Sequence, residues 1–559
     1  MPNEAHLYAP PATDRTFDHE RVANEIKHWV RLTAACNSKC IFCLDAEAQD
    51  GRFMAFDDIC TEIRRGREEN GATRLVVSGG EASIHPRFHD AIRYGKAQGY
   101  RWVQTVTNGQ KLADRQFFLT AMEAGLDEIT FSLHGHTAAL HDRLTRTKNG
   151  FDNLMKAMIR AVRDGRPVVN VDVCINRQNV EHLEAIVALC ARVGVKEFDL
   201  LHVIPQGEAW KNRDELFYDP EEHREALRRV FRLGRHPQFH IWTNRFPVSH
   251  LEDLEELIQD PHKMFDEVGG RRTQFRRYLD EGRAIDCRDA ERCPNCFIEP
   301  FCTTLDRHMA RQHAGAFDVW TGHVWTGEGP RARYTRDTYV SADRYTPDVS
   351  RVIATKPEHL DLPLGPGVEL EVHLDKTMCE ALRDRPIPPH WILHAPTRPT
   401  AEASAELDPD WRAFFASLPP GVRASNLPAC LCPGAILEAP LHVLDAHLFH
   451  SDGRMAIDAM VEEFVGKHYR VKSSRCRSCP ADRWCEGGHI QSIRAHGFRH
   501  LQPLPEGDET DAVIARLATM ADPTPRVRDG AAPQPGSLRI PIEGAPPVPF
   551  IDDNPGRRS

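Results

Sequence analysis

The sequence lacks any run of about eighteen apolar residues, and the residues after Met1 form no apolar core of a secretion signal. A membrane-spanning helix and export are therefore not expected, and we expect a cytoplasmic protein whose thiols stay reduced. An excess of basic residues is also missing, since 71 Lys and Arg stand against 81 Asp and Glu for a formal charge of −10. This balance argues against a broad surface for nucleic acid.

The first cysteine group lacks a fourth member. Cys36, Cys40 and Cys43 stand in the run CNSKCIFC near the start of the 559-residue chain, which holds 16 cysteines. Four thiolates would close a structural zinc or iron–sulfur site, whereas three thiolates on a four-iron cluster leave one iron open to another ligand. The group therefore indicates a reactive cluster, with a zinc site completed by a distant ligand as the alternative.

Between about residues 26 and 205, short β-branched segments alternate with amphipathic segments, which is typical of a parallel sheet covered by helices. Six mostly apolar strands are expected, over residues 29–35, 74–78, 102–107, 128–133, 168–175 and 197–204. Helices are expected between them, for example over 56–70 and 151–163. The pattern predicts a partial (β/α)6 TIM-like barrel.

Polar and glycine residues follow each expected strand, at the edge where such barrels place their active sites. After the cysteine group come, strand by strand, Gly79-Gly80-Glu81, Asn108, Ser132, Asn176 and Pro205. Gly-Gly and Asn-Gly pairs are also ordinary turn formers, but their agreement at one edge favours a shared site.

With these residues in place, the sequence resembles the radical S-adenosylmethionine (SAM) superfamily over about residues 28–215. The hallmark of that family is Cys-x3-Cys-x-aromatic-Cys, in which Phe42 supplies the aromatic residue here. The segment Gly79-Gly80-Glu81 is similar to the family segment whose backbone and carboxylate hold the amino group of SAM. The resemblance therefore implies a SAM-binding site beside the cysteine group.

The resemblance extends, on looser motifs, to the later strand ends. It implies that Asn108 and Ser132 lie near the ribose and carboxylate of SAM. Asn176 and residues 203–205 would flank the ribose and adenine.

The chemistry that the resemblance implies depends on a [4Fe–4S] cluster bound by Cys36, Cys40 and Cys43, with SAM on the open iron. An electron from the reduced cluster would break a carbon–sulfur bond, and the 5′-deoxyadenosyl radical would take a hydrogen atom from the substrate. A donor such as ferredoxin or flavodoxin would supply the electron, while the protein orients the substrate and excludes water. The sequence names no further catalytic side chain.

Two further cysteine groups follow the barrel at one shared spacing, Cys-x2-Cys-x5-Cys. They are Cys293, Cys296 and Cys302, with Cys287 just upstream, and Cys476, Cys479 and Cys485. This spacing resembles the auxiliary-cluster regions called SPASM or twitch in radical SAM enzymes. The fuller family pattern has another cysteine a few positions later, where this chain has Asp306 and His489.

The fourth ligands of these groups have candidates elsewhere. We expect Cys287 to complete the first group and Cys430 or Cys432 to complete the second, with His489 as the runner-up. One or two auxiliary iron–sulfur clusters are expected, as electron conduits or as substrate-binding sites. Zinc is the alternative, because four thiolates, or three with a histidine, bind zinc equally well. The remaining cysteines have no partner spacing and are expected to be ordinary buried thiols: Cys60, Cys174, Cys190 and Cys379.

The expected fold class is α/β, a partial (β/α)6 TIM-like barrel followed by α+β iron–sulfur regions. The expected segments are an N-terminal extension (1–27), the barrel (28–235), a first cysteine region (236–310), an irregular connecting region (311–425), a second SPASM-like cysteine region (426–505) and a largely disordered tail (506–559). A short helix is expected at the start of that tail, over 509–520. The connecting region shows no sustained hydrophobic period, and the tail is rich in Pro, Gly and Arg.

The leading hypothesis is a radical SAM enzyme that modifies a peptide or a small molecule. The alternative from another class is a non-catalytic iron–sulfur electron carrier or a zinc-stabilised binding protein. Glu81 and its two glycines separate these hypotheses, because a carrier needs no group for the ammonium of an amino acid.

Overall fold

The computed structural model describes residues 26–313, 318–320, 339–342, 351–439, 443–532 and 538. The chain divides into two compact units, Met1–Asp260 and Pro261–Ser559. The first unit carries the first cysteine group, and the second unit carries both later groups.

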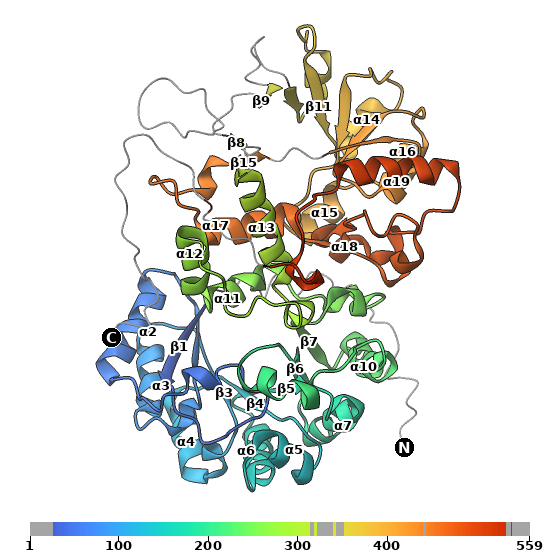
Figure 1. The fold of residues 1–559 in the computed structure, drawn as a ribbon. Helices are drawn as coiled ribbons and strands as arrows, with labels where there is room; N and C mark the ends of the chain where they lie inside the picture. Colours follow the sequence, from blue (N-terminus) through green and yellow to red (C-terminus); the bar gives the residue numbers. More distant parts are fainter. Residues whose placement is uncertain are drawn as a thin grey trace. The chain divides into compact units, whose positions relative to one another are not determined.

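Seven parallel strands form the sheet of the first unit in the order β1-β2-β3-β4-β5-β6-β7, so that neighbours in sequence are neighbours in the sheet (Figure 1). The strands are β1 (Lys27–Thr33), β2 (Arg74–Gly79), β3 (Trp102–Thr107), β4 (Glu128–Ser132), β5 (Val168–Ile175), β6 (Glu197–His202) and β7 (His240–Asn244). The helices are α2 (Phe56–Glu68), α3 (Phe88–Ala97), α4 (Arg115–Ala124), α5 (Ala138–Thr145), α6 (Gly150–Asp164), α7 (Leu183–Val193), α8 (Gly207–Lys211), α9 (Arg213–Leu216) and α10 (Arg224–Phe231).

The sequence pattern explains these elements. Leu75, Val76 and Val77 are consecutive and fully buried, because a strand of a parallel sheet is covered on both faces. Helix α6 instead buries Leu154, Ala157, Met158 and Ala161, the one-sided spacing of an amphipathic helix.

The predicted partial barrel is confirmed, and all six expected strands are present with ends within two residues of those expected. The count of six was wrong, because β7 adds a seventh strand parallel to β6. Its five residues bury only Ile241 and Thr243, a pattern too short to stand out in the sequence. The first unit consequently extends to Asp260, past the boundary expected at residue 235.

A second parallel sheet lies in the second unit, with six strands in the order β14-β13-β12-β11-β10-β9 (Figure 1). The strands are β9 (Tyr339–Ser341), β10 (Arg351–Ala354), β11 (Glu369–His373), β12 (Trp391–His394), β13 (Arg423–Ser425) and β14 (Ile436–Glu438). The expectation of an irregular region over 311–425 is therefore wrong for its described part. Strands of three to five residues are too short to produce a visible period in the sequence.

Helices make up much of the rest of the second unit. They are α11 (Met264–Gly269), α12 (Arg272–Glu281), α13 (Glu299–His313), α14 (Lys376–Leu382), α15 (Ala401–Leu407), α16 (Trp411–Ala416), α17 (Ile457–Glu463), α18 (Ile490–His496) and α19 (Asp508–Met520). Two small sheets pair β8 (Asp318–Trp320) with β15 (Val443–Asp445), and β16 (Arg470–Val471) with β17 (Gly488–His489).

An aromatic core joins the two cysteine regions within the second unit. Phe301 of α13 packs edge-on against Phe275 of α12 and against Phe464, with ring centroids 5.5 Å apart in both pairs. The ion pair between Arg272 and Asp458 also links α12 to α17. The two regions therefore share one folded unit.

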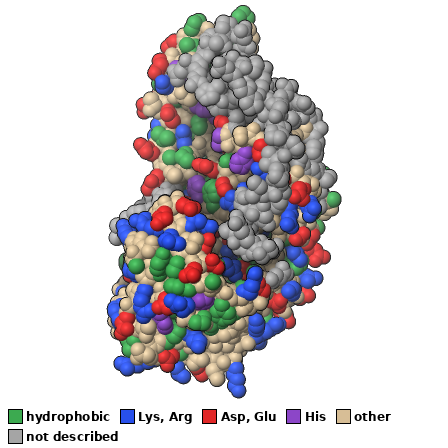
Figure 2. All heavy atoms as spheres, turned by 90° about the vertical axis from the view of Figure 1, so that its left-hand side faces the viewer, with side chains coloured by type: hydrophobic (Ala, Val, Ile, Leu, Met, Phe, Trp, Pro, Cys, Tyr) green, Lys and Arg blue, Asp and Glu red, His purple; other side chains and the backbone are tan. Residues whose placement is uncertain are grey.

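The surface of the described residues shows no single-sign field in the view of Figure 2, where Lys, Arg, Asp and Glu side chains are intermixed. Within the described part of the chain, no helix combines the length and the apolar character needed to cross a bilayer. Helix α19 (Asp508–Met520) covers the helix expected at the start of the tail, and residues 533–537 and 539–559 of that tail lie outside the described residues.

Candidate functional site

The loop after β1 brings the first three thiols together. Cys40 lies close enough to Cys36 and Cys43 for each of them to raise its pKa, and Cys43 does the same to Cys36. Burial is the larger cause for both and raises the pKa of the Cys36 thiol to about 11. The three thiols are thus neutral on their own, and a bound metal cation would favour their thiolate forms.

Backbone contacts to later parts of the barrel fix this loop. The N–H of Ile41 donates to the carbonyl of Leu144 at 2.9 Å, and the side-chain amide of Asn212 donates to the carbonyl of Ile41 at 3.0 Å. At the far end, the N–H of Glu208 donates to the carbonyl of Cys43 at 2.9 Å. The loop is therefore held by the connections after β4 and β6.

Gly79 and Gly80 bring the end of β2 against the cysteine loop. The N–H of Gly80 donates to the carbonyl of Thr33 at 2.8 Å. A Cβ on Gly80 would lie 2.3 Å from the carbonyl oxygen of Ala35 and 3.1 Å from Cβ of Cys36, and Gly79 has φ +152°. Only glycine permits this approach, which leaves the backbone of the segment close to the thiols.

Glu81 is buried, and the protein itself supplies its hydrogen bonds. One carboxylate oxygen accepts from the N–H of Ser83 at 3.0 Å, from its hydroxyl, and from the Thr107 hydroxyl at 2.8 Å. The other accepts from the N–H of Asn108 at 2.8 Å. Through these four hydrogen bonds Glu81 ties the end of β2 to the end of β3. A contact from its carboxylate to SAM stays a prediction.

Asn108 faces the cysteine loop, as expected for a residue of this edge. Its side-chain amide donates to Oδ1 of Asn37 at 2.7 Å and to the Ser38 hydroxyl at 3.2 Å. Both acceptors lie between Cys36 and Cys40. Asn108 therefore holds the loop as well as lining the same edge.

Ser132 contacts an acidic residue, Asp172, that was not expected from the sequence. Its hydroxyl donates to Oδ2 of Asp172 at 3.1 Å, while Oδ1 of Asp172 is buried without a hydrogen-bond partner. Burial raises the pKa of Asp172 to about 7, with a smaller contribution from Asp199. A buried carboxylate oxygen with spare capacity fits a hydroxyl or ammonium donor of a ligand. The available signal was an Asp in the middle of the apolar run VVNVDVCI.

Other expected residues of the edge make internal contacts. Asn176 is fully buried, and its amide donates to the carbonyl of Cys174 at 3.0 Å. The Phe42 ring meets the buried His134 ring edge-on, with centroids 4.5 Å apart. The thiol of Cys174 contributes to the raised pKa of Cys40, so a residue expected to be an ordinary buried thiol lies beside the first cysteine group.

A cavity in the second unit is lined by four thiols, which are those of Cys430, Cys476, Cys479 and Cys485. Burial, as the larger cause, and the other three thiols together raise the pKa of Cys430 to about 11. The N–H groups of Gly487 and Leu504 donate to the sulfurs of Cys485 and Cys479, each at 3.4 Å. Sulfurs that accept backbone hydrogen bonds are typical of cysteines that bind metal or clusters.

Gly487 makes the approach of this loop to β16 possible. It has φ +89°, and a Cβ there would lie 2.1 Å from the carbonyl oxygen of Val471. The glycine that follows Cys485-Glu486 therefore sets the position of the third thiol of the group.

The two other candidates for the fourth ligand lie elsewhere. His489 does not line the cavity, and its Nε2 lies 3.0 Å from the carbonyl oxygen of Val465. Cys432 is buried outside the lining, with its sulfur 3.4 Å from the carbonyl oxygen of Pro428. The arrangement favours Cys430 over both.

The remaining cysteine group also gathers its thiols. Cys296 and Cys287 both raise the pKa of Cys302, and Cys296 raises that of Cys293, in each case after burial as the larger cause. The guanidinium of Arg271 lies 3.9 Å from the sulfur of Cys296. A fixed cation beside the group would stabilise thiolates.

Asp306, which stands where the family pattern has a cysteine, makes contacts with other side chains instead. Its carboxylate forms a buried ion pair with Arg288 and accepts from the hydroxyl of Tyr278. The geometry thus favours Cys287 as the fourth member of the first auxiliary group.

Comparison with known protein families gives a match within the first unit. Residues 30–190 match the family model of the radical SAM superfamily. Residues 30–190, which include the three-cysteine loop and the parallel strands β2 to β5, thus form a radical SAM domain, and members of this superfamily use a [4Fe–4S] cluster and SAM.

Among curated proteins, the chain is similar to probable GTP 3′,8-cyclases of archaea. It is 29% identical over 191 residues to that of Saccharolobus islandicus strain M.14.25, which is 34% of this chain and 61% of the relative. It is 29% identical over 158 residues to that of Methanopyrus kandleri, or 28% of this chain and 50% of the relative. The chain therefore spans well under two thirds of the length of these relatives.

Among solved structures, Streptococcus suis SuiB bound to its precursor peptide SuiA matches 41% of this chain and 52% of its own at 16% identity, with a TM-score of 0.34. The enzyme anSMEcpe with bound AdoMet and a peptide matches 37% and 59% at 15% identity, with a TM-score of 0.31.

Proposed function

We propose that this chain is a radical SAM enzyme that abstracts a hydrogen atom from a peptide or small-molecule substrate in the cytoplasm. The bound cluster and SAM supply the 5′-deoxyadenosyl radical. Cys36, Cys40 and Cys43 hold the cluster, and the backbone of Gly79 and Gly80 receives the methionine part of SAM. A ferredoxin or flavodoxin delivers the electron.

The observation that carries the proposal is the contact between the Gly79-Gly80 segment and the three-cysteine loop. A Cβ on Gly80 would collide with Ala35 at 2.3 Å, so the two segments could not come this close with any other residue. An electron carrier needs the thiols but no such contact. Asp172 adds a buried oxygen with spare capacity at the same strand ends.

We propose that the second unit holds two auxiliary clusters, or zinc in their place. Their ligands are Cys287, Cys293, Cys296 and Cys302 at the first site and Cys430, Cys476, Cys479 and Cys485 at the second. Four thiols at each site leave no open iron, which favours electron transfer over direct binding of substrate.

The test uses full-length protein reconstituted with iron and sulfide without oxygen. The reduced wild type should convert SAM to 5′-deoxyadenosine, and the Cys36/Cys40/Cys43 triple alanine variant should not. Cys60→Ala is the control, because Cys60 lies on α2 away from the other thiols and should leave turnover unchanged. Equal turnover by wild type and triple variant would sink the proposal.

Gly80→Ala separates an enzyme from an electron carrier. This variant should keep its iron and lose SAM cleavage, because the added Cβ displaces the segment that receives SAM. Gly269→Ala is the matched control, since a Cβ there meets no atom within 4 Å. Unchanged cleavage by Gly80→Ala would remove the main support for the SAM site.

The substrate is then sought by deuterium transfer into 5′-deoxyadenosine. The candidates are deuterated peptides, extract of cells grown in heavy water, and deuterated GTP, since GTP is the substrate in the names of the curated relatives. Deuterium from peptides would support a peptide substrate, and deuterium from GTP would support a small-molecule one.

A further inference from the structure

The second parallel sheet ends in a row of polar side chains that neither cysteine group uses. His373 of β11, His394 of β12, Ser425 of β13 and Glu438 of β14 are successive partners across the sheet, at the carboxyl ends of their strands. Partners in a parallel sheet project to the same face, and the carboxyl ends of parallel strands are where ligands of α/β proteins bind.

Three of the side chains at this edge form a compact donor set, here called the His-Glu cluster (Glu371, His373 and His394). One ligand atom from each lies within 4.8 Å of those of the other two. Nε2 of His373 lies 2.9 Å from Oε1 of Glu371, and Nδ1 of His394 lies 3.9 Å from the same oxygen. The two rings face each other at 30°, with centroids 4.7 Å apart.

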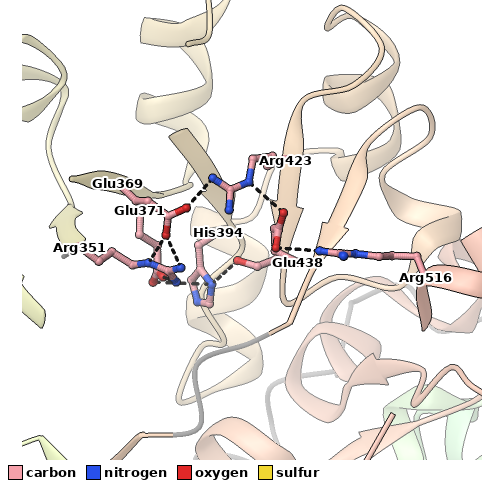
Figure 3. Close-up of polar contacts among 8 residues, drawn as sticks. Arg351, Glu369, Glu371, His394, Arg423, Glu438 and Arg516 are labelled. Carbon is pink, nitrogen blue, oxygen red and sulfur yellow. Dashed lines mark hydrogen bonds and ion pairs between the residues drawn. The ribbon is translucent and has the colours of Figure 1, made fainter. Parts of the chain in front are cut away.

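Neighbouring side chains orient the cluster from outside (Figure 3). Arg351 donates to Oε2 of Glu371 at 3.0 Å, which leaves Oε1 toward the two histidines. The hydroxyl of Ser425 lies 2.9 Å from Nδ1 of His394, the same nitrogen that lies 3.9 Å from Oε1 of Glu371, so this contact leaves Nε2 of His394 for a metal ion. Fixed partners of this kind hold metal ligands in place and set their geometry.

The charges around the cluster are balanced by an ordered network. Arg351 pairs with Glu369 at 2.6 Å, and Arg423 bridges Glu369 at 2.7 Å and Glu438 at 2.9 Å. Arg516 of α19 completes the row by pairing with Glu438 at 3.0 Å (Figure 3). The acidic residues beside the cluster are thus neutralised, and Glu371 is the carboxylate that faces imidazole.

The three side chains of the cluster differ in exposure. The side chain of Glu371 is 6% exposed, whereas those of His394 and His373 are 18% and 26% exposed. The carboxylate is therefore desolvated, while the histidines remain accessible to solvent and to an entering ion. Oε1 of Glu371 thus faces two imidazoles, although a single histidine would suffice to pair with it.

We propose that the His-Glu cluster binds a first-row divalent metal ion such as Zn²⁺ or Fe²⁺. Two imidazole nitrogens and one carboxylate oxygen are the donor set of catalytic zinc sites and of 2-His-1-carboxylate iron sites. Three protein ligands leave coordination positions open for water or for an oxygen of a ligand. Calcium and magnesium are disfavoured, because they prefer oxygen ligands only.

The test must separate this site from the thiols. Full-length protein with its clusters reconstituted is titrated with Co²⁺, whose d–d absorption reports nitrogen and oxygen ligands and whose thiolate charge-transfer band reports cysteine. The wild type should gain d–d absorption without the charge-transfer band. His373→Ala and His394→Ala should each weaken this binding by about tenfold or more.

His390→Ala is the matched control, because His390 is exposed and lies directly before β12. This variant should bind Co²⁺ like the wild type. Equal binding by wild type, His373→Ala and His394→Ala would overturn the proposal and leave the cluster as a histidine–carboxylate ion pair.

X-ray absorption of the cobalt-loaded wild type keeps the proposal falsifiable if the variants fail to fold. Nitrogen and oxygen neighbours with the outer-shell scattering of imidazole would support the site, and sulfur neighbours alone would overturn it. Because this site uses no residue of the radical SAM domain, its failure would leave the proposed function untouched.

Discussion

The thiol sites of the two units differ in the number of thiols that each gathers. In the radical SAM domain three thiols share one loop, and a glycine segment packs against that loop. In the second unit four thiols line one cavity, and the fourth comes from Cys430, 46 residues before Cys476 in the sequence. The difference teaches that one loop can supply three thiols by itself, whereas the fourth thiol of this cavity comes from a segment far away in the sequence.

The largest effect should come from replacing one thiol of each site. Cys40→Ser should bring SAM cleavage to background, because the two thiols that remain are too few to hold the cluster. Cys430→Ser should keep SAM cleavage measurable while the protein loses metal. The measurements are 5′-deoxyadenosine formation and iron or zinc content per chain. If Cys430→Ser abolished cleavage as fully as Cys40→Ser, the two sites would not differ in the way proposed.

The second prediction sharpens the choice of fourth ligand. Cys430→Ser should lose the metal of its cavity, whereas Cys432→Ser and His489→Gln should retain it, since neither residue lines that cavity. Cys432→Ser should instead cost about 1–3 kcal/mol of unfolding free energy, because a polar hydroxyl replaces a buried thiol. Metal analysis together with urea unfolding checks this, and metal loss in Cys432→Ser alone would reverse the assignment.

The third prediction concerns Glu81. Glu81→Gln should lower the unfolding free energy by about 1.5–3 kcal/mol, because an amide cannot accept all four hydrogen bonds of the buried carboxylate. Iron content should stay near that of the wild type, since no thiol is changed. Urea unfolding measures the stability. An unchanged stability would contradict the role of Glu81 in tying the end of β2 to the end of β3.

The last prediction is the pH dependence that Asp172 gives to stability. Burial raises the pKa of Asp172 to about 7, so between about pH 4 and pH 7 the folded state binds a proton that the unfolded state releases. Its contribution to stability is fully present below about pH 4 and is lost as pH rises toward 7, by at most about 1.4 kcal/mol per pH unit. Asp172→Asn should flatten this slope between pH 5 and 7, as measured by urea unfolding. An identical slope in both proteins would place the titration elsewhere.

Sequence patterns were sufficient where the elements were long and the motif was local. The strands over 102–107 and 168–175 have the ends that were expected, and Cys36, Cys40 and Cys43 follow β1 as predicted. Patterns failed for β7 and for the second sheet, whose strands of three to five residues complete no hydrophobic period. The roles of Asp172 and Cys174 depend on burial beside residues of other strands, which only the folded chain reveals.

The hydrogen bonds that hold the first cysteine loop bear on how a cluster would be loaded. Ile41 is hydrogen-bonded to both Leu144 and Asn212, and the carbonyl of Cys43 accepts from the N–H of Glu208, so these three contacts use no thiol. Zinc fingers, by contrast, fold only when metal arrives. Transfer of a cluster to this loop should therefore be fast and should add little secondary structure, as expected for binding to a preformed site. Stopped-flow circular dichroism during transfer from a scaffold protein would then stay flat while the cluster absorbance rises.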